Sequence, residues 1–278
     1  MPSSITSDSA LKTLQTTIVL AGAGKMGGAM LTGWLAQGLD ARRVVVIEPY
    51  PSDEISALVT KGVRLNPSPT EGAVATLVIA LKPQSFREAG ATLKSFVGSS
   101  TLAVSIMAGT PIALLEATVG GSVVRAMPNT PAAIGRGITV AVGNRRVTAK
   151  ARKLAHGLLA ATGSVEWVND ESLMDAVTAV SGSGPAYIFL LAEELARAGV
   201  EAGLPPELAT RLARETVAGS GELLHRSEAP SATLRQNVTS PGGTTAAALE
   251  VLMGPDGMQS LLTRAVAAAT RRSKELAQ

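Results

Sequence analysis

The chain has 278 residues, of which 46% are apolar, and its 25 basic and 22 acidic residues leave a formal net charge of +3. This length and apolar content permit a sizeable core and predict two domains. Cysteine is absent, which excludes disulfides and thiolate chemistry, and nothing argues for an oxidising compartment. Aromatic residues make up only 3%, which argues against a nucleic-acid partner.

The first 15 residues are polar and contain no apolar stretch of signal-peptide length, so we predict a disordered tail over residues 1–15. Residues 95–115 carry no charge and are long enough to span a bilayer. However, Gly98, Gly109 and Pro111 divide this stretch into shorter elements. We therefore expect no membrane segment and a cytoplasmic protein.

Residues 16–168 alternate short β-branched runs with helical patterns. The predicted strands cover residues 17–21, 44–48, 77–81, 102–107, 123–127, 138–143 and 165–168. Ser52, Thr110 and Thr148 are expected to cap helices between them, and residues 68–71 have the pattern of a capping box. This alternation predicts an α/β fold, in which a parallel sheet with crossover helices forms a Rossmann-like dinucleotide-binding domain.

Residues 169–278 contain no convincing strand. Alanine- and leucine-rich stretches predict helices at residues 173–180, 186–202, 207–225, 244–253 and 258–276. Two of these helices, at 186–202 and 258–276, are apolar on more than one face, which indicates burial against neighbours or another subunit. We therefore expect an all-helical C-terminal domain that forms a dimer.

A glycine-rich sequence, Gly22-Ala23-Gly24-Lys25-Met26-Gly27, follows the first predicted strand and opens a helix. In a dinucleotide fingerprint the first two glycines allow a tight turn beside a pyrophosphate, and the third allows close packing of helix and strand. A tight turn without a ligand is the alternative. Glu48 ends the second strand, where a carboxylate accepts hydrogen bonds from the adenosine ribose and opposes a 2′-phosphate. We therefore expect NADH to be used at least as well as NADPH.

A second glycine-rich sequence, Ser240-Pro241-Gly242-Gly243-Thr244-Thr245, precedes a predicted helix. Free N–H groups at a helix N-terminus can hold a small carboxylate, although a simple turn is the alternative. His156 and His225 have no carboxylate or histidine at ligand spacing, so we assign them structural roles and expect no metal.

Five segments of the chain resemble the pyrroline-5-carboxylate reductase family, whose members make proline by reducing a cyclic imine. They are Gly22-Ala23-Gly24-Lys25-Met26-Gly27, Leu81-Lys82-Pro83, Met127-Pro128-Asn129-Thr130-Pro131, Ser181-Gly182-Ser183-Gly184-Pro185-Ala186-Tyr187 and Asn237-Val238-Thr239-Ser240-Pro241-Gly242-Gly243-Thr244-Thr245. The resemblance covers nearly everything after residue 16. It implies a Rossmann-like domain followed by a helical domain, residues 169–278, that interlocks two subunits, and dimers that assemble further.

The same resemblance implies roles for individual residues. The cofactor would contact Gly22, Gly24, Lys25, Met26, Gly27, Glu48, Leu81, Lys82, Pro83, Ala108, Gly109, Asn129 and Thr130. The substrate pocket would comprise Ser181, Gly182, Ser183, Ser240, Gly242, Gly243, Thr244 and Thr245. Thr245 is placed to hydrogen-bond the ring nitrogen and is the candidate catalytic residue. Glu48 departs from the small hydroxyl residue that is common in NADPH-using members.

The implied reaction is hydride transfer from NADH or NADPH to 1-pyrroline-5-carboxylate, the last step of proline biosynthesis, with the protein orienting two bound molecules. Two alternatives remain open. A β-hydroxyacid dehydrogenase would carry a catalytic lysine on the helix at 186–202, which contains none. A non-catalytic dinucleotide-binding protein would keep residues 22–27 but would have no need of the pocket at 240–245.

Overall fold

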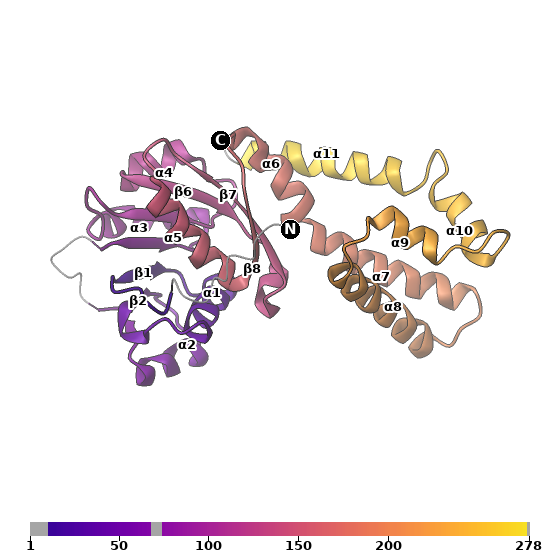
Figure 1. Ribbon diagram of the computed structural model, residues 1–278, viewed down its shortest axis with the longest axis horizontal. Coiled ribbons are helices and arrows are strands. Elements are labelled where there is room, and N and C mark those ends of the chain that lie inside the picture. The colour runs from indigo at the N-terminus through magenta and orange to yellow at the C-terminus, as the bar shows by residue number, and fades with distance from the viewer. Residues whose placement is uncertain (1–10, 68–73, 277–278) are drawn as a thin grey trace. The chain divides into compact units, whose positions relative to one another are not determined.

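The computed structural model describes residues 11–67 and 74–276, and its internal contacts divide the chain into two units. The first unit runs to Gly182 and resumes at Thr270, and the second covers Ser183–Ala269 (Figure 1). We expected the boundary after residue 168. The division falls later because residues 169–182 pack with the sheet unit, where Met174 is buried among the side chains on one face of the sheet.

An eight-stranded sheet forms the framework of the first unit. Its strands are β1 (Ile18–Ala21), β2 (Val44–Ile47), β3 (Arg64–Leu65), β4 (Thr76–Ile79), β5 (Leu102–Ser105), β6 (Ser122–Met127), β7 (Gly137–Gly143) and β8 (Gly163–Trp167). They lie in the order β3-β2-β1-β4-β5-β6-β7-β8. The predicted Rossmann-like sheet is confirmed, with the short β3 as an addition.

One strand pair departs from the predicted parallel arrangement. β6 and β7 are antiparallel, whereas the other neighbouring pairs are parallel. The connection between these two strands holds only a short 3-10 helix, η3 (Thr130–Ile134). A parallel pair needs a crossover of a dozen or more residues, so this short connection reverses the chain direction.

Helices cover both faces of the sheet. In β1, Ile18 and Leu20 belong to one buried cluster while Val19 and Ala21 belong to the other, because successive side chains of a strand point to opposite faces. The first cluster includes side chains of α1 (Lys25–Ala36), α2 (Asp53–Ala57) and α5 (Ala149–Leu159). The second includes side chains of α3 (Pro83–Lys94), α4 (Ile112–Val119) and α6 (Met174–Val177).

Helix starts follow the predicted caps in two cases. Ser52 Oγ accepts a hydrogen bond from the Ile55 amide, and Thr148 Oγ1 accepts one from the Ala151 amide. The predicted cap at Thr110 is wrong, because no side chain of the local sequence caps α4. The predicted capping box at residues 68–71 lies outside the described residues.

The start of α4 is instead capped from a distant part of the chain. Glu171 Oε1 accepts a hydrogen bond from the Ile112 amide at 2.8 Å and from Arg125 Nη1 at 2.8 Å. Arg125 lies in β6 with its side chain 7% exposed, whereas that of Glu171 is 32% exposed. In the same turn, hydrogen bonds from the Ser172 side chain and amide lower the pKa of Asp170. The Glu171 carboxylate thus joins β6, the segment after β8 and the start of α4.

Ordered packing begins before β1. Leu11 is 1% exposed in the cluster that α1 covers, together with Trp34, whose Nε1 donates to the Leu158 carbonyl at 2.8 Å. The predicted disordered tail covered residues 1–15, of which residues 1–10 lie outside the described part. Burial of Leu11 places at least part of the segment 11–15 in the folded unit.

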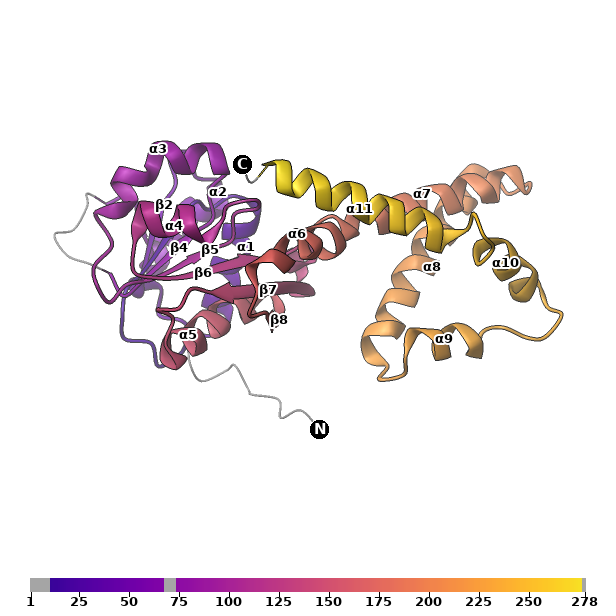
Figure 2. The same ribbon diagram turned by 90° about the horizontal axis from the view of Figure 1, so that it is seen from above.

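The second unit consists of helices, as predicted (Figure 2). They are α7 (Gly184–Glu201), α8 (Pro206–Arg226), α9 (Ser231–Asn237), α10 (Thr244–Leu252) and the first part of α11 (Met258–Leu276). α9 was not predicted, because its seven residues show no clear apolar periodicity. The end of α11 belongs to the first unit, where the buried Ser273 donates a hydrogen bond to Asp175 of α6 at 2.7 Å.

Candidate functional site

The turn after β1 has the geometry that the glycine-rich sequence predicts. Gly22 has a φ of +90°, and a Cβ at this position would lie 2.6 Å from the Ala80 carbonyl oxygen. A Cβ on Gly27 would collide with the carbonyl oxygen of Gly22. A side chain at Gly22 would therefore collide with the backbone that follows β4, and one at Gly27 would push α1 away from the turn after β1. The start of α1, at Gly24 and Lys25, remains exposed, with its unpaired N–H groups available to a ligand.

The Glu48 side chain folds back onto this turn. Its Oε2 accepts a hydrogen bond from the Ala23 amide at 2.9 Å, and its Oε1 accepts one from the Tyr50 amide at 3.1 Å. A carboxylate offers about four acceptor positions, so each oxygen can still accept another hydrogen bond. The carboxylate therefore has a fixed orientation and remaining capacity for two hydroxyl groups.

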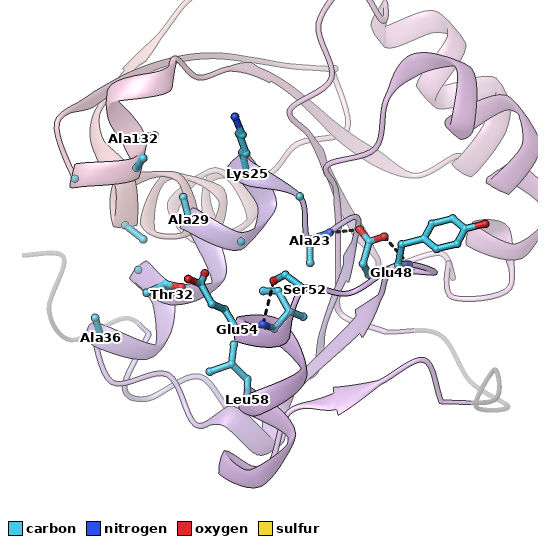
Figure 3. Close-up of a pocket in the computed structure, with 18 residues that line it drawn as sticks. Ala23, Lys25, Ala29, Thr32, Ala36, Glu48, Ser52, Glu54, Leu58 and Ala132 are labelled. Carbon is cyan, nitrogen blue, oxygen red and sulfur yellow. Dashed lines mark hydrogen bonds between the residues drawn. The ribbon is translucent and has the colours of Figure 1, made fainter.

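A cavity of about 900 Å³ opens beside this turn, and the charged residues Lys25 and Glu48 both line it. It is lined by Ala23, Gly24, Lys25, Gly28, Ala29, Thr32, Gly33, Ala36, Glu48, Tyr50, Ser52, Glu54, Ile55, Leu58, Ala132, Ala133, Gly135 and Ala161. Figure 3 shows Lys25 extending from the start of α1 away from Glu48. Among the predicted cofactor residues, Gly24, Lys25 and Glu48 line this cavity.

The other predicted cofactor segments lie at the same edge of the sheet. Leu81-Lys82-Pro83 follow β4, and Ala108-Gly109 follow β5, while Gly22 follows β1. These three strands are adjacent and parallel, so the residues after them meet at one edge. β2 and β3 extend the sheet on one side of β1, and the chain then crosses to the other side to add β4 and the strands after it. Open α/β sheets bind ligands at such a switch point, which lies here between β1 and β4. Lys82 is exposed and precedes the first residue of α3, Pro83.

Asn129 and Thr130 follow β6, which is parallel to β5 and so delivers them to this edge as well. The Asn129 Oδ1 atom accepts a hydrogen bond from the Ile138 amide at 2.9 Å. This bond fixes the side-chain amide against the start of β7. Thr130 is exposed at the first position of η3.

Part of the predicted substrate segment lies next to the segment that follows β6. Residues Thr178–Gly182 form a π-helix, a rare element that is frequent at functional sites. Within it, Ser181 Oγ donates to the Val177 carbonyl at 2.9 Å. A Cβ on Gly182 would lie 2.5 Å from Cε of Met127, the last residue of β6. The first unit therefore brings Gly182 against the start of the Met127–Thr130 segment, while Ser183 belongs to the second unit.

The segment Ser240–Thr245 lies wholly in the second unit. Gly243 N–H donates to the Ser240 carbonyl at 3.0 Å, Gly242 has a φ of +68°, and α10 begins at Thr244. No side chain caps this helix start, so its first amides remain open to a ligand. Within the described ranges the half-buried Thr245 has no hydrogen-bond partner for its hydroxyl.

The structure adds cavity residues that the sequence reasoning missed. Tyr50 is 91% exposed and lies beside Glu48, and Thr32 and Ser52 also line the cavity. Asn66 hydrogen-bonds the backbone of Glu48 across 18 positions of sequence. An aromatic residue two positions after a strand-end carboxylate was a usable signal for Tyr50. Asn66 carried no such signal, because its role depends on the pairing of β2 with β3.

The helices of the second unit present large exposed apolar side chains. They include Ile188, Phe189, Leu190, Leu212, Leu223, Leu224, Val251, Leu252, Leu261 and Leu262. Exposed large apolar side chains in this number favour an interaction face on the helical unit. In the first unit, by contrast, His156 is engaged: its Nδ1 accepts a hydrogen bond from Trp167 Nε1 at 3.3 Å. Across residues 11–67 and 74–276, no helix is both long and apolar enough to cross a membrane.

Both parts of the chain match known family descriptions. Residues 171–276 match "Pyrroline-5-carboxylate reductase dimerisation", and residues 17–109 match "NADP oxidoreductase coenzyme F420-dependent". The chain is 39% identical to a pyrroline-5-carboxylate reductase of Pseudomonas aeruginosa over 94% of this chain and 97% of the relative. It is 40% identical to one of Synechocystis over 92% of this chain and 96% of that relative.

Solved structures agree with these sequence relatives. A pyrroline-5-carboxylate reductase of Coxiella burnetii superimposes with a TM-score of 0.87 at 34% identity, covering 95% of this chain and 100% of the other. A pyrroline carboxylate reductase of Plasmodium falciparum with NADP bound has a TM-score of 0.76 at 31% identity, covering 95% and 99%.

Proposed function

The chain belongs to the pyrroline-5-carboxylate reductase family, and we propose that it reduces 1-pyrroline-5-carboxylate to L-proline with NADH or NADPH, the last step of proline biosynthesis. The observation that carries this conclusion is the identity of 39% to a curated reductase across 94% of the chain. The tight turn at Gly22 and the exposed start of α1, at the switch point of the sheet, supply a place for the cofactor pyrophosphate.

When bound, a reduced nicotinamide would supply a hydride from its C4–H bond to the imine carbon and would be left oxidised, while the electrons of the C=N bond would move to nitrogen. A protonated imine then becomes the neutral secondary amine of proline without a further proton. The chain contributes binding and orientation. In this proposal the amides at the start of α10 hold the substrate carboxylate, and the Thr245 hydroxyl hydrogen-bonds the ring nitrogen.

The remaining predicted residues take supporting roles in the proposal. Lys82 and Pro83 lie against the cofactor ribose and phosphates, Ala108 and Gly109 line the next crossover, and Asn129 and Thr130 flank the nicotinamide. The fixed Asn129 side chain and the Gly182–Met127 contact support a preformed nicotinamide side of the site. Ser181 and Ser183 border the substrate.

For the cofactor we propose that NADH serves at least as well as NADPH. The two backbone amides that fix the Glu48 carboxylate leave one acceptor position on each oxygen for the 2′- and 3′-hydroxyls of an adenosine ribose. A 2′-phosphate would meet this negative charge instead. The second carboxylate of the cavity, Glu54, adds to that charge, while Lys25 extends away from Glu48 (Figure 3).

The test is a steady-state assay with 1-pyrroline-5-carboxylate and each cofactor. We expect turnover with both, and Glu48→Ser should shift the NADH-to-NADPH ratio of kcat/KM toward NADPH by about tenfold, since contact between like charges costs at least about 1 kcal/mol. Glu88→Ser is the matched control, because Glu88 is an exposed carboxylate of α3 that does not line the cavity, and it should leave the ratio near that of the wild type. No reduction of the imine would refute the activity, and a strong wild-type preference for NADPH would refute the cofactor proposal.

We further propose that the protein is cytoplasmic and forms a homodimer through the second unit. The dimers then assemble further. The match to a dimerisation domain over residues 171–276 and the exposed apolar side chains of α7, α8, α10 and α11 support the dimer. A cysteine-free chain that uses a reduced nicotinamide cofactor suits a reducing compartment. Sedimentation at micromolar concentration tests the assembly, and a monomer would contradict it.

A further inference from the structure

We propose that Asn66 is a positioning residue that sets cofactor selectivity by holding the backbone of Glu48. Its Oδ1 accepts a hydrogen bond from the Glu48 amide at 2.9 Å, and its Nδ2 donates one to the Glu48 carbonyl at 2.8 Å. The side chain therefore binds both backbone groups of one residue, as a neighbouring strand would. The inference rests on the proposed contact between Glu48 and the adenosine ribose.

The main chain of Asn66 is held in an unusual conformation. Its φ is +45°, and among the described residues it is the only one other than glycine with a positive φ. Its amide also donates to the Val46 carbonyl of β2 at 2.8 Å. Asparagine tolerates this left-handed region better than most residues, but the conformation still costs free energy that surrounding contacts must offset. Three hydrogen bonds to the end of β2 supply those contacts.

These bonds extend the β2–β3 pairing past the point where both strands end. β3 pairs Arg64 with Val45 and Leu65 with Val46, and the Asn66 side chain then continues to Glu48. The Glu48 carboxylate in turn accepts a hydrogen bond from the Ala23 amide in the glycine-rich turn. A continuous set of hydrogen bonds thus runs from the β3 end to the turn that receives the pyrophosphate.

Asn66 is exposed and does not line the cavity, so its effect on the cofactor would act through Glu48. Freeing the Glu48 backbone would let its carboxylate leave the position that suits two ribose hydroxyls. Binding of NADH depends on that position. The affinity for NADPH, whose 2′-phosphate meets the same carboxylate, would fall less than the affinity for NADH or would rise.

The experiment compares the NADH-to-NADPH ratio of kcat/KM in Asn66→Gly, Arg64→Ala, Glu48→Ser and wild type. Asn66→Gly removes both side-chain hydrogen bonds while glycine accepts the positive φ without strain. We expect it to lower the ratio about fivefold or more, chiefly through a higher KM for NADH, since two neutral hydrogen bonds are lost. Arg64→Ala changes an exposed side chain on the same short strand and should leave the ratio unchanged.

Three results would overturn the inference. A wild-type ratio in Asn66→Gly shows that Glu48 does not need this support. An equal loss with both cofactors, or a loss shared by Arg64→Ala, shows a general structural effect of the β3 region. If Glu48→Ser leaves the ratio unchanged, the proposed ribose contact fails and takes the role of Asn66 with it. If Glu48→Ser shifts the ratio and Asn66→Gly does not, the ribose contact stands and only the role of Asn66 is refuted.

Discussion

Replacing Glu171 by alanine tests the hydrogen bonds that join β6 to the start of α4. The substitution leaves the Arg125 guanidinium, 7% exposed, without its counter-charge and leaves the Ile112 amide without its acceptor. Loss of one charge-assisted and one ordinary hydrogen bond predicts a decrease in unfolding free energy of about 2–4 kcal/mol. Breaking a fully buried pair costs about 3–5 kcal/mol, and the 32% exposure of Glu171 puts the expectation at the lower end, about 2–3 kcal/mol.

The measurement is equilibrium unfolding in urea at one fixed protein concentration, because an oligomer's stability depends on concentration. Glu275→Ala is the control: it breaks the Arg272–Glu275 pair, whose side chains are 66% and 60% exposed, and should cost less than about 1 kcal/mol. Glu171→Gln keeps an acceptor for the Ile112 amide and should lie between the two. If Glu171→Ala costs no more than Glu275→Ala, the reasoning from burial is refuted.

Three further predictions follow from the site and the helical unit. Thr245→Ala should lower turnover about tenfold or more with NADH affinity unchanged, because one oriented hydrogen bond is worth about 1–2 kcal/mol; a loss confined to Thr244→Ala would move the role to that residue. Gly27→Ala should destabilise the protein by about 1–3 kcal/mol in urea because its Cβ meets the Gly22 carbonyl. Gly24→Ala, whose Cβ meets no atom within 4 Å, should stay near wild type, and equal effects would contradict this account. Dilution to a monomer should abolish most of the specific activity, and unchanged activity would refute a site that depends on the dimer.

Local patterns predicted the central part of the fold well. β1, β2, β4 and β5 are short, mostly apolar runs buried on both faces, and such runs are typical of parallel strands. β3 escaped prediction because two residues carry no periodicity and pair only where β2 is already in place. The cap of α4 also escaped, because Glu171 lies 59 positions from Ile112.

For the candidate site, the sequence identified the residues whose roles depend on local geometry. Gly22 and Gly27 could be assigned because a turn between strand and helix requires glycine at those positions, and both lie against neighbouring backbone. Glu48 could be placed at the end of its strand, but its hydrogen bonds to the Ala23 and Tyr50 amides could not. The contribution of Asn66 depends on strand pairing, which no local pattern encodes.

The return of the chain to the first unit at Thr270 has a consequence for biosynthesis. Domains generally fold as units while translation proceeds from the N-terminus. Here Asp175 receives its hydrogen bond from Ser273 only after the whole helical unit has been translated. The nascent sheet unit therefore remains incomplete until residues 270–276 have been translated. A gene fragment that stops after residue 182 would encode a sheet unit without its final helical segment.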